Sequence, residues 1–217
     1  MARNMKSRAK VLLIALAVML PLVPGGAAES PSSLTDADKA DIARIEVYLN
    51  TIRSFKGRFV QLSSSGGFVE GKIYLRRPGF LRLKYAPPAT IQLYGDGTWL
   101  IFVDNELQQV NHVAISSTPA SVLLDKNVYL SGRVRVTGVE HPPGAIRLRL
   151  IHSEEPDAGT LTLTLTEAPL TLRQWDVTDA QAVKTRVTLL DTEFNVPIDD
   201  TLFVFETPKD WLGQDNN

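Results

Sequence analysis

Hydrophobic and polar residues follow two different periods along this chain, and the change comes near Gly57. Before that point, four apolar residues recur at helical spacing and make one face: Ile42, Ile45, Leu49 and Ile52. Thr35 is a suitable N-cap, and Asp38 three residues later completes a capping box. The pattern therefore predicts one amphipathic helix that begins after Thr35 and ends before Gly57.

From residue 59 onwards the period is two, which is typical of β-strands. The alternation predicts strands over residues 59–62, 69–77, 80–85, 91–94, 99–103, 107–110, 133–137, 145–151, 161–166, 170–178, 183–193 and 203–205. Because the connections are short and rich in turn residues, we expect an antiparallel meander rather than a parallel sheet. Thr118 and Pro119 interrupt this meander with the sequence of a helix start, and a short apolar helix is predicted over residues 120–124.

Each strand divides into an apolar and a polar face, because successive side chains point to opposite sides. We therefore expect a mainly β, α+β fold: one large curved antiparallel sheet whose apolar face is covered by the two helices. Two interpretations of that face remain open, namely an ordinary packed core and a cavity under a movable lid. The candidate lining residues of the cavity are Ile73, Leu75, Leu81, Leu83, Leu148, Leu161 and Leu163. The candidate lid residues are Pro119, Val122, Leu123 and Leu124.

Arg77 does not fit an ordinary apolar face. By alternation it follows Ile73 and Leu75 on that face, and Pro78 holds it in an extended conformation. A cation that faces an apolar interior is costly unless it is paired. Either the strand ends before Arg77 and its side chain lies in solvent, or the guanidinium donates to backbone carbonyls of the cover. The spacing leaves both interpretations open.

The first 28 residues have the three parts of a secretory signal peptide. A basic start precedes an unbroken apolar run over residues 11–20, and Ala27 and Ala28 supply the small residues of a cleavage site. The alternative is a membrane anchor, but the run is shorter than the roughly 20 residues that a span needs. We expect cleavage after Ala28 and a single domain over residues 29–217.

The composition excludes several kinds of chemistry. The chain holds no cysteine, so it has no disulfide, no thiol nucleophile and no cysteine to carry a lipid. It has no G-x-S-x-G motif, and its histidines lie on separate segments: His112, His141 and His152. The net charge of −1 does not favour a nucleic-acid partner. We expect no catalytic residues, no bound metal and no cofactor.

An ordered set of short motifs resembles the outer-membrane lipoprotein carrier family (LolA). The motifs include Gly57-Arg58-Phe59-Val60-Gln61, Arg77-Pro78-Gly79-Phe80-Leu81-Arg82, Asp96-Gly97, Thr118-Pro119-Ala120 and Phe203-Val204-Phe205. One departure is Trp99, because the family often places tryptophan later in the strand after Asp-Gly.

The resemblance implies a fold, a function and a set of partners. The fold is an incomplete β-barrel with a helical lid, and Arg77 corresponds to the family's arginine before proline, which holds the lid by hydrogen bonds. The function is that of a periplasmic carrier, which takes acylated lipoproteins from an inner-membrane ABC transporter to an outer-membrane acceptor. With the resemblance, the cavity becomes the favoured interpretation of the apolar face, and we expect a monomer.

Three alternatives stay open beside this function. These alternatives are a sensing module on the same fold, a carrier of another lipid, and an enzyme that acts on acyl groups. The lack of a second domain argues against the sensor, and the lack of a nucleophile with a nearby base argues against the enzyme.

Overall fold

The computed structural model describes residues 34–118, 121–208 and 211 of the chain. The expected signal peptide and the expected lid residue Pro119 lie outside the described residues, so both stay predictions. The helices are α1 (Asp36–Thr51) and α2 (Ser121–Leu124), with short 3-10 turns η1 (Ile115–Ser117), η2 (Pro156–Ala158) and η3 (Asp200–Phe203). The strands are β1 (Ser54–Ser63), β2 (Phe68–Arg76), β3 (Phe80–Tyr85), β4 (Ile91–Asp96), β5 (Trp99–Asp104), β6 (Gln109–Ala114), β7 (Val134–Glu140), β8 (Ala145–His152), β9 (Gly159–Glu167), β10 (Leu170–Asp179) and β11 (Lys184–Phe194).

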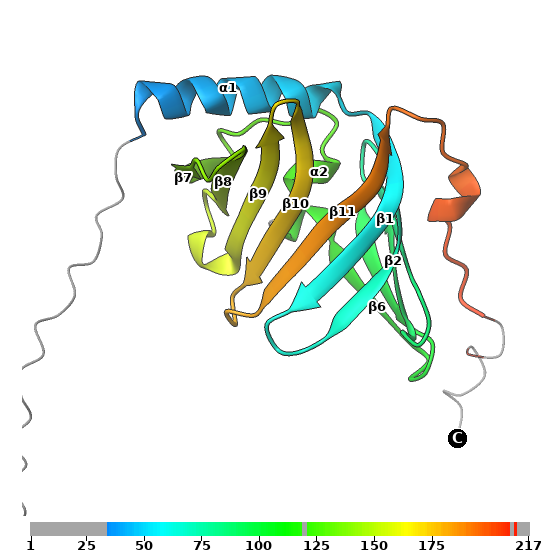
Figure 1. The fold of residues 1–217 in the computed structure, drawn as a ribbon. Helices are drawn as coiled ribbons and strands as arrows, with labels where there is room; N and C mark the ends of the chain where they lie inside the picture. The colour runs from blue at the N-terminus through cyan, green and yellow to red at the C-terminus, as the bar shows by residue number, and fades with distance from the viewer. Residues whose placement is uncertain (1–33, 119–120, 209–210, 212–217) are drawn as a thin grey trace, which may run out of the picture. The chain divides into compact units, whose positions relative to one another are not determined.

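The strands form one antiparallel sheet in the order β6-β5-β4-β3-β2-β1-β11-β10-β9-β8-β7. The pairing of β1 with β11 joins the two halves of the meander, while β6 and β7 remain as edges. Figure 1 shows the sheet curving strongly, with α1 lying across the end where β9 turns into β10. The predicted fold class is confirmed: a mainly β, unclosed antiparallel sheet with an N-terminal helix and short helices.

Helix α1 forms where the sequence predicts it. The Thr35 hydroxyl accepts a hydrogen bond from the Asp38 N–H at 3.1 Å, and the Asp38 carboxylate accepts one from the Thr35 N–H at 2.8 Å. This reciprocal pair satisfies two of the backbone donors that a helix start leaves free. The opposite end has no basic side chain in its last turn, and there the Ile52 N–H and the Thr51 hydroxyl donate to the carbonyls of Leu49 and Tyr48.

The apolar face of the sheet, called the inner face here, holds the core. The alternating leucines of β8 and β9 are almost fully buried and pair across the strands, as Leu148 does with Leu163. Ile45 and Leu49 of α1 and the apolar residues of α2 belong to the same cluster. The two helices therefore cover the inner face, as the hydrophobic pattern predicts.

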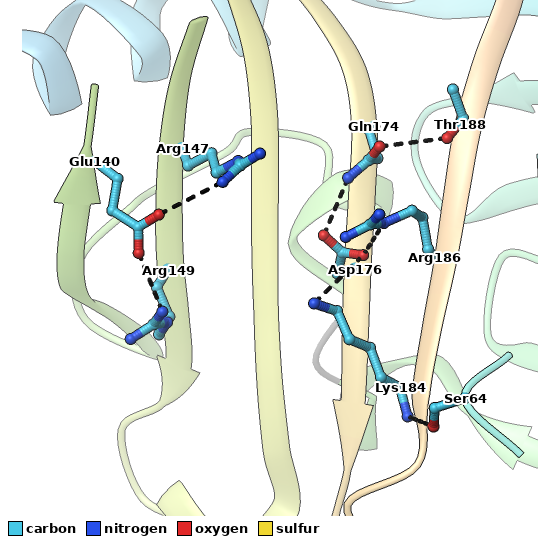
Figure 2. A network of polar contacts seen from close by, with 9 residues as sticks. All are labelled: Ser64, Glu140, Arg147, Arg149, Gln174, Asp176, Lys184, Arg186 and Thr188. Carbon is cyan, nitrogen blue, oxygen red and sulfur yellow. Dashed lines mark hydrogen bonds and ion pairs between the residues drawn. The ribbon is translucent and has the colours of Figure 1, made fainter. Parts of the chain in front are cut away.

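The outer face of β7–β11 is polar. Glu140 lies within 4 Å of Arg147 and Arg149, and the Asp176 carboxylate accepts a hydrogen bond from Arg186 at 2.7 Å (Figure 2). The threonines of β9 lie on the strand between these two groups. This half of the sheet agrees with the expected polar face.

The outer face of β2–β5 is different, because the C-terminal segment covers it. The ring of Phe203 lies 5.5 Å from that of Phe80, and the ring of Phe205 lies 5.3 Å from that of Tyr94. By alternation Arg82 belongs to the polar face of its strand, but it is only 6% exposed, and its guanidinium lies 3.7 Å from the centre of the Tyr94 ring. The polar face that the alternation predicts is therefore not exposed to solvent in this region.

The predicted strand over residues 203–205 was also wrong. Phe203 ends the 3-10 turn η3, and Val204 and Phe205 have no regular structure. Their aromatic side chains pack on the sheet from outside instead of adding a strand to it.

Candidate functional site

The interior between the sheet and the helices is occupied by a short stretch of chain, residues 121–130, called the covering segment here. It contains α2 and inserts five apolar side chains into the core cluster: Val122, Leu123, Leu124, Val128 and Leu130. All five are at most 5% exposed. The covering segment therefore fills part of the space that the sequence analysis assigns to a cavity.

Three side chains hold the covering segment by hydrogen bonds, two from α1 and one from just after that helix. The Asn50 amide bonds both the N–H and the carbonyl of Val128, at 2.9 and 2.8 Å. The Glu46 carboxylate accepts a hydrogen bond from the Leu130 N–H at 2.7 Å, and Arg53 donates to the carbonyl of Lys126 at 3.3 Å. These are side-chain bonds to backbone, and none of them belongs to a strand pairing.

Arg77 connects the covering segment to α1 and to the sheet. Its Nε donates to the Leu123 carbonyl at 2.9 Å, while Nη1 donates to the carbonyls of Leu49 and Ile52 at 2.5 and 3.1 Å. The next turn adds a backbone bond from the Gly79 N–H to the Leu124 carbonyl at 2.8 Å. Gly79 has a φ of +79°, and a Cβ there would lie 2.5 Å from Gly97, so only glycine fits this turn.

The Arg77 side chain is thus turned toward the cover rather than into solvent. Burial lowers the pKa of its guanidinium to about 10, which leaves it charged at neutral pH. The contact with Leu123 lies where the sequence analysis expected a bond to the lid, although the role of a latch stays a prediction. The bonds to the end of α1 were missed. The one signal for them is the lack of a basic residue in the last turn of that helix.

The structure places the candidate lining residues on one continuous inner surface. Ile73, Leu75, Leu83, Leu148, Leu161 and Leu163 are at most 5% exposed, and half-buried Leu81 packs against them. Along β2 and β3 the register pairs Ile73 with Leu83 and Leu75 with Leu81. Leu148, Leu161 and Leu163 lie on β8 and β9, across the sheet. Whether these residues contact a ligand stays a prediction.

An opening leads to this surface from the end of the sheet opposite α1. It has a volume of about 290 Å³ and is lined by Gln61, Ser63, Gly66, Gly67, Val69, Tyr85, Ala89, Ile91 and Phe102. Ile91 and Phe102 are 47% and 38% exposed, so apolar side chains meet solvent here. The ring of Tyr85 stands edge-on to that of buried Phe59, and its hydroxyl bonds Gln61 at 3.0 Å. Sequence reasoning did not single out this opening.

The inner face of β2 runs from this opening to Arg77. Val69 lines the opening, Ile73 and Leu75 lie in the core, and Arg77 follows the strand at the far end. Eight residues of strand span about 26 Å. One leaflet of a bilayer holds acyl chains within about 15 Å, half of the hydrocarbon core. The surface under the covering segment is therefore long enough for an extended acyl chain.

A second pocket lies between the covering segment and the start of β7. It has a volume of about 420 Å³ and is lined by Val122, Asp125, Tyr129, Ser131, Gly132, Arg133 and Val134. An ion pair between Arg133 and Asp125 closes the loop that leads from the covering segment into β7.

The described residues contain no group of three or more side chains that could hold a metal ion. His141 is paired with Asp41 of α1 at 2.7 Å, and His112 faces the ring of Trp99. Among the helices of the described part of the chain, none is long and apolar enough to cross a membrane.

A family model described as outer membrane lipoprotein carrier protein LolA matches residues 50–206. This range includes the whole sheet and the covering segment.

Among the relatives, an uncharacterized protein of Rickettsia prowazekii (strain Madrid E) is 30% identical over 87 residues, which are 40% of this chain and 41% of that protein. The chain thus spans less than half the length of this relative. An outer-membrane lipoprotein carrier protein of Methylococcus capsulatus is 26% identical over 200 residues, or 88% of this chain and 92% of the relative. A LolA superfamily protein of Nitrosomonas europaea has a solved structure with a TM-score of 0.45 and 9% identity, covering 76% of this chain and 97% of the other.

Proposed function

Because the chain belongs to the LolA family of outer membrane lipoprotein carrier proteins, a family of carriers rather than enzymes, we propose that it is a periplasmic carrier of lipoproteins. Its inner face binds the acyl chains, and the signal peptide over residues 1–28 directs it to the periplasm. The observation that carries the proposal is the apolar surface that runs from an opening at Phe102 to the buried Arg77 guanidinium beneath the covering segment.

The energies of cover and cargo are of similar size, which is what a carrier requires. Burial of a long acyl chain contributes on the order of 10 kcal/mol, at about 0.8 kcal/mol for each methylene. The five apolar side chains of the covering segment lose about 7–15 kcal/mol in total when they leave the interior. Since one burial replaces the other, the net affinity stays moderate and the cargo can be released.

The lipoproteins come from an inner-membrane ABC transporter and pass to an outer-membrane acceptor. In this cycle the acyl chains enter at the opening and displace the covering segment, breaking the bonds of Asn50, Glu46 and Arg77 to it. When the acceptor withdraws the cargo, the covering segment returns and the same bonds reform. The cover therefore favours release without a cofactor or an energy source in the carrier itself.

The test introduces a charge at the opening. We expect Phe102→Glu to weaken binding of a fluorescent fatty acyl probe at least tenfold, because an unpaired carboxylate in an apolar site is costly. Phe102 pairs with Leu93 of the core cluster and lines the opening, so its substitution acts at the site itself.

Phe68→Glu is the matched control, because Phe68 is also exposed, at 62%, and is not among the residues that line the opening. Its register partner is Leu62, which is exposed as well. The proposal fails if the probe does not bind the parent protein, or if both variants weaken binding equally while circular dichroism shows them folded.

A further inference from the structure

The two edges of the sheet are built differently. β7 carries the devices that prevent pairing with another strand: the charged residues Arg135 and Glu140, and a bulge between Val136 and Gly138. β6 has the sequence Gln-Val-Asn-His-Val-Ala, with no Lys, Arg, Asp, Glu or proline, and its six pairs with β5 run without a register shift. It is a straight edge that can accept another strand.

The alternation of hydrogen-bonded and non-bonded pairs between β5 and β6 identifies which backbone groups of β6 point away from the sheet. Just beyond the strand, the Ile115 N–H donates to the carbonyl of its opposite residue Thr98 at 3.0 Å, so that pair is hydrogen-bonded. Bonded and non-bonded pairs alternate along an antiparallel ladder. Gln109, Asn111 and Val113 therefore bond to β5, while the N–H groups of the alternate residues point away from it: Val110, His112 and Ala114.

These outward groups have no backbone partner among the residues that the structure describes. The carbonyl of Ala114 accepts a bond from the Ser117 hydroxyl, but its N–H is not used. The N–H groups of Val110, His112 and Ala114 and the carbonyls of Val110 and His112 thus form a row of donors and acceptors, the pattern that an added strand satisfies.

This edge adjoins the opening to the inner face. Phe102, which lines the opening, is the direct register partner of Asn111 on β6. Neighbouring strands lie about 4.8 Å apart, so a chain that leaves the opening at Phe102 reaches the free side of β6 within two strand spacings.

We propose that β6 binds the polypeptide segment next to the acyl chains of the cargo as an additional antiparallel or parallel strand. The inference rests on the proposed function, because the acyl chains in the opening place that segment beside β6. Recognition runs through the main chain, and β6 presents no charged side chain that would select a sequence. A carrier gains from this because cargoes with different sequences share the same backbone.

A second copy of this chain is the other possible occupant of an open edge. Stable dimers use about 20–30 residues on each side. β6 offers six, and the neighbouring β5–β6 hairpin adds few more. An extended segment already tethered by its acyl chains needs far less interface, since tethering raises its local concentration.

The experiment compares two ligands with the same acyl chain. One is a palmitoylated hexapeptide of uncharged residues, and the other carries N-methyl groups on alternate residues so that it cannot pair as a strand. We expect the parent protein to bind the first about tenfold more tightly than the second, since several main-chain hydrogen bonds are lost. A free fatty acyl probe measures the acyl site alone.

Ala114→Pro removes one outward donor with little strain, because Ala114 already has a φ of −59° and proline requires about −65°. We expect it to reduce the difference between the two peptides to about threefold while the affinity for the free acyl probe is unchanged. Ala114→Ser keeps the N–H and is the matched control. His112→Pro, in the middle of the strand, gives a second variant should the first fail to fold.

Amide hydrogen exchange gives the sharpest readout. On binding of the unmethylated peptide, the amides of Val110, His112 and Ala114 should exchange more slowly, and those of Gln109, Asn111 and Val113 should not change. A general tightening of the fold would slow both sets.

If both peptides bind equally and Ala114→Pro has no effect while the acyl probe binds, strand addition is overturned and the carrier function stands. If no acyl ligand binds, the proposed function fails and the inference fails with it. If the three outward amides are protected without ligand as protein concentration rises, β6 pairs with a second copy, and that result also overturns the proposal.

Discussion

Arg77 makes two kinds of contact, and they have different consequences. Through Nη1 it donates to the carbonyls of Leu49 and Ile52 at the end of α1, a contact that does not involve the covering segment. Through Nε it donates to Leu123 of the covering segment, and this bond exists only while the cover is in place. One side chain therefore joins the covering segment to α1.

Arg77→Leu should affect both stability and binding. The lost charge-assisted bonds are worth about 1.5–3 kcal/mol each, so the unfolding free energy of the empty protein should fall by at least about 2 kcal/mol. The affinity for an acyl probe should rise several-fold, and release of loaded lipoprotein to an outer-membrane acceptor should slow, because the empty closed state is weakened. Chemical denaturation, probe titration and a transfer assay measure the three effects.

Arg76→Leu is the matched control for this prediction. Arg76 is the preceding residue and also an arginine, but it pairs with Asp200 and contacts neither helix in the hydrogen bonds of the described residues. A clamp at Arg77 is ruled out if Arg77→Leu binds and releases acyl cargo at the same rates as Arg76→Leu. The rates at which Arg77→Lys binds and releases acyl cargo should lie between those of the parent protein and Arg77→Leu, because an ammonium group cannot reproduce the planar, forked hydrogen bonding of a guanidinium.

Two arginines show what the alternation of apolar and polar residues predicts and what it does not. It placed Arg77 correctly on the inner face, because side-chain direction follows from strand period alone. It also placed Arg82 correctly on the outer face but not its burial, because its guanidinium lies against Tyr94 of the next strand, whose ring in turn packs on Phe205, 123 positions after Arg82. Direction is local information, whereas exposure depends on distant segments.

At the scale of elements, the same distinction explains which predictions succeeded. The capping box and the apolar face of α1, and the strict Leu-Thr alternation of β9, are local signals that agree with the fold. β1 begins at Ser54, earlier than expected, because Gly57 does not end an element but lies at a bulge in the strand. A Cβ at Gly57 would lie 2.9 Å from the Leu190 carbonyl, so close strand packing explains the glycine.

The covering segment is the element whose attachment can be changed without touching the sheet. Asn50→Ala removes both side-chain bonds to Val128, which contribute about 0.5–1.5 kcal/mol each. We expect the empty protein to lose about 1–3 kcal/mol of stability and its affinity for an acyl probe to increase, because less energy opposes displacement of the cover. Thermal unfolding and fluorescence titration test the two effects.

Thr51→Ala provides the comparison on the same turn of α1. The Thr51 hydroxyl donates to the Tyr48 carbonyl within the helix and is not bonded to the covering segment. Its loss should alter stability slightly and binding not at all. Equal probe affinity for Asn50→Ala and Thr51→Ala would show that the cover does not compete with acyl chains.

For the molecule as a whole, binding of cargo should leave the sheet protected from hydrogen exchange and should expose the covering segment to it. The sheet is joined by continuous ladders from β6 to β7, whereas residues 121–130 are held by a few side-chain bonds, the backbone bond from Gly79 to Leu124 and apolar contact. The sequence indicated a cover but not that its side chains fill the interior, since that depends on how α1, Arg77 and the loop after α2 meet in space.

Binding of an acyl ligand should therefore raise the melting temperature and at the same time loosen part of the protein. A ligand at 100 times its Kd stabilises the folded state by about 2.7 kcal/mol. Yet the amides of Asp125, Val128 and Leu130, now bonded to Ser121, Asn50 and Glu46, should exchange faster once the covering segment is displaced. The amides of Ile73 and Leu83 in the paired strands should stay protected.

Differential scanning fluorimetry and hydrogen exchange on one sample measure both effects. Slower exchange at Val128 and Leu130 on binding would mean that cargo binds with the cover in place, and the displacement mechanism would be wrong.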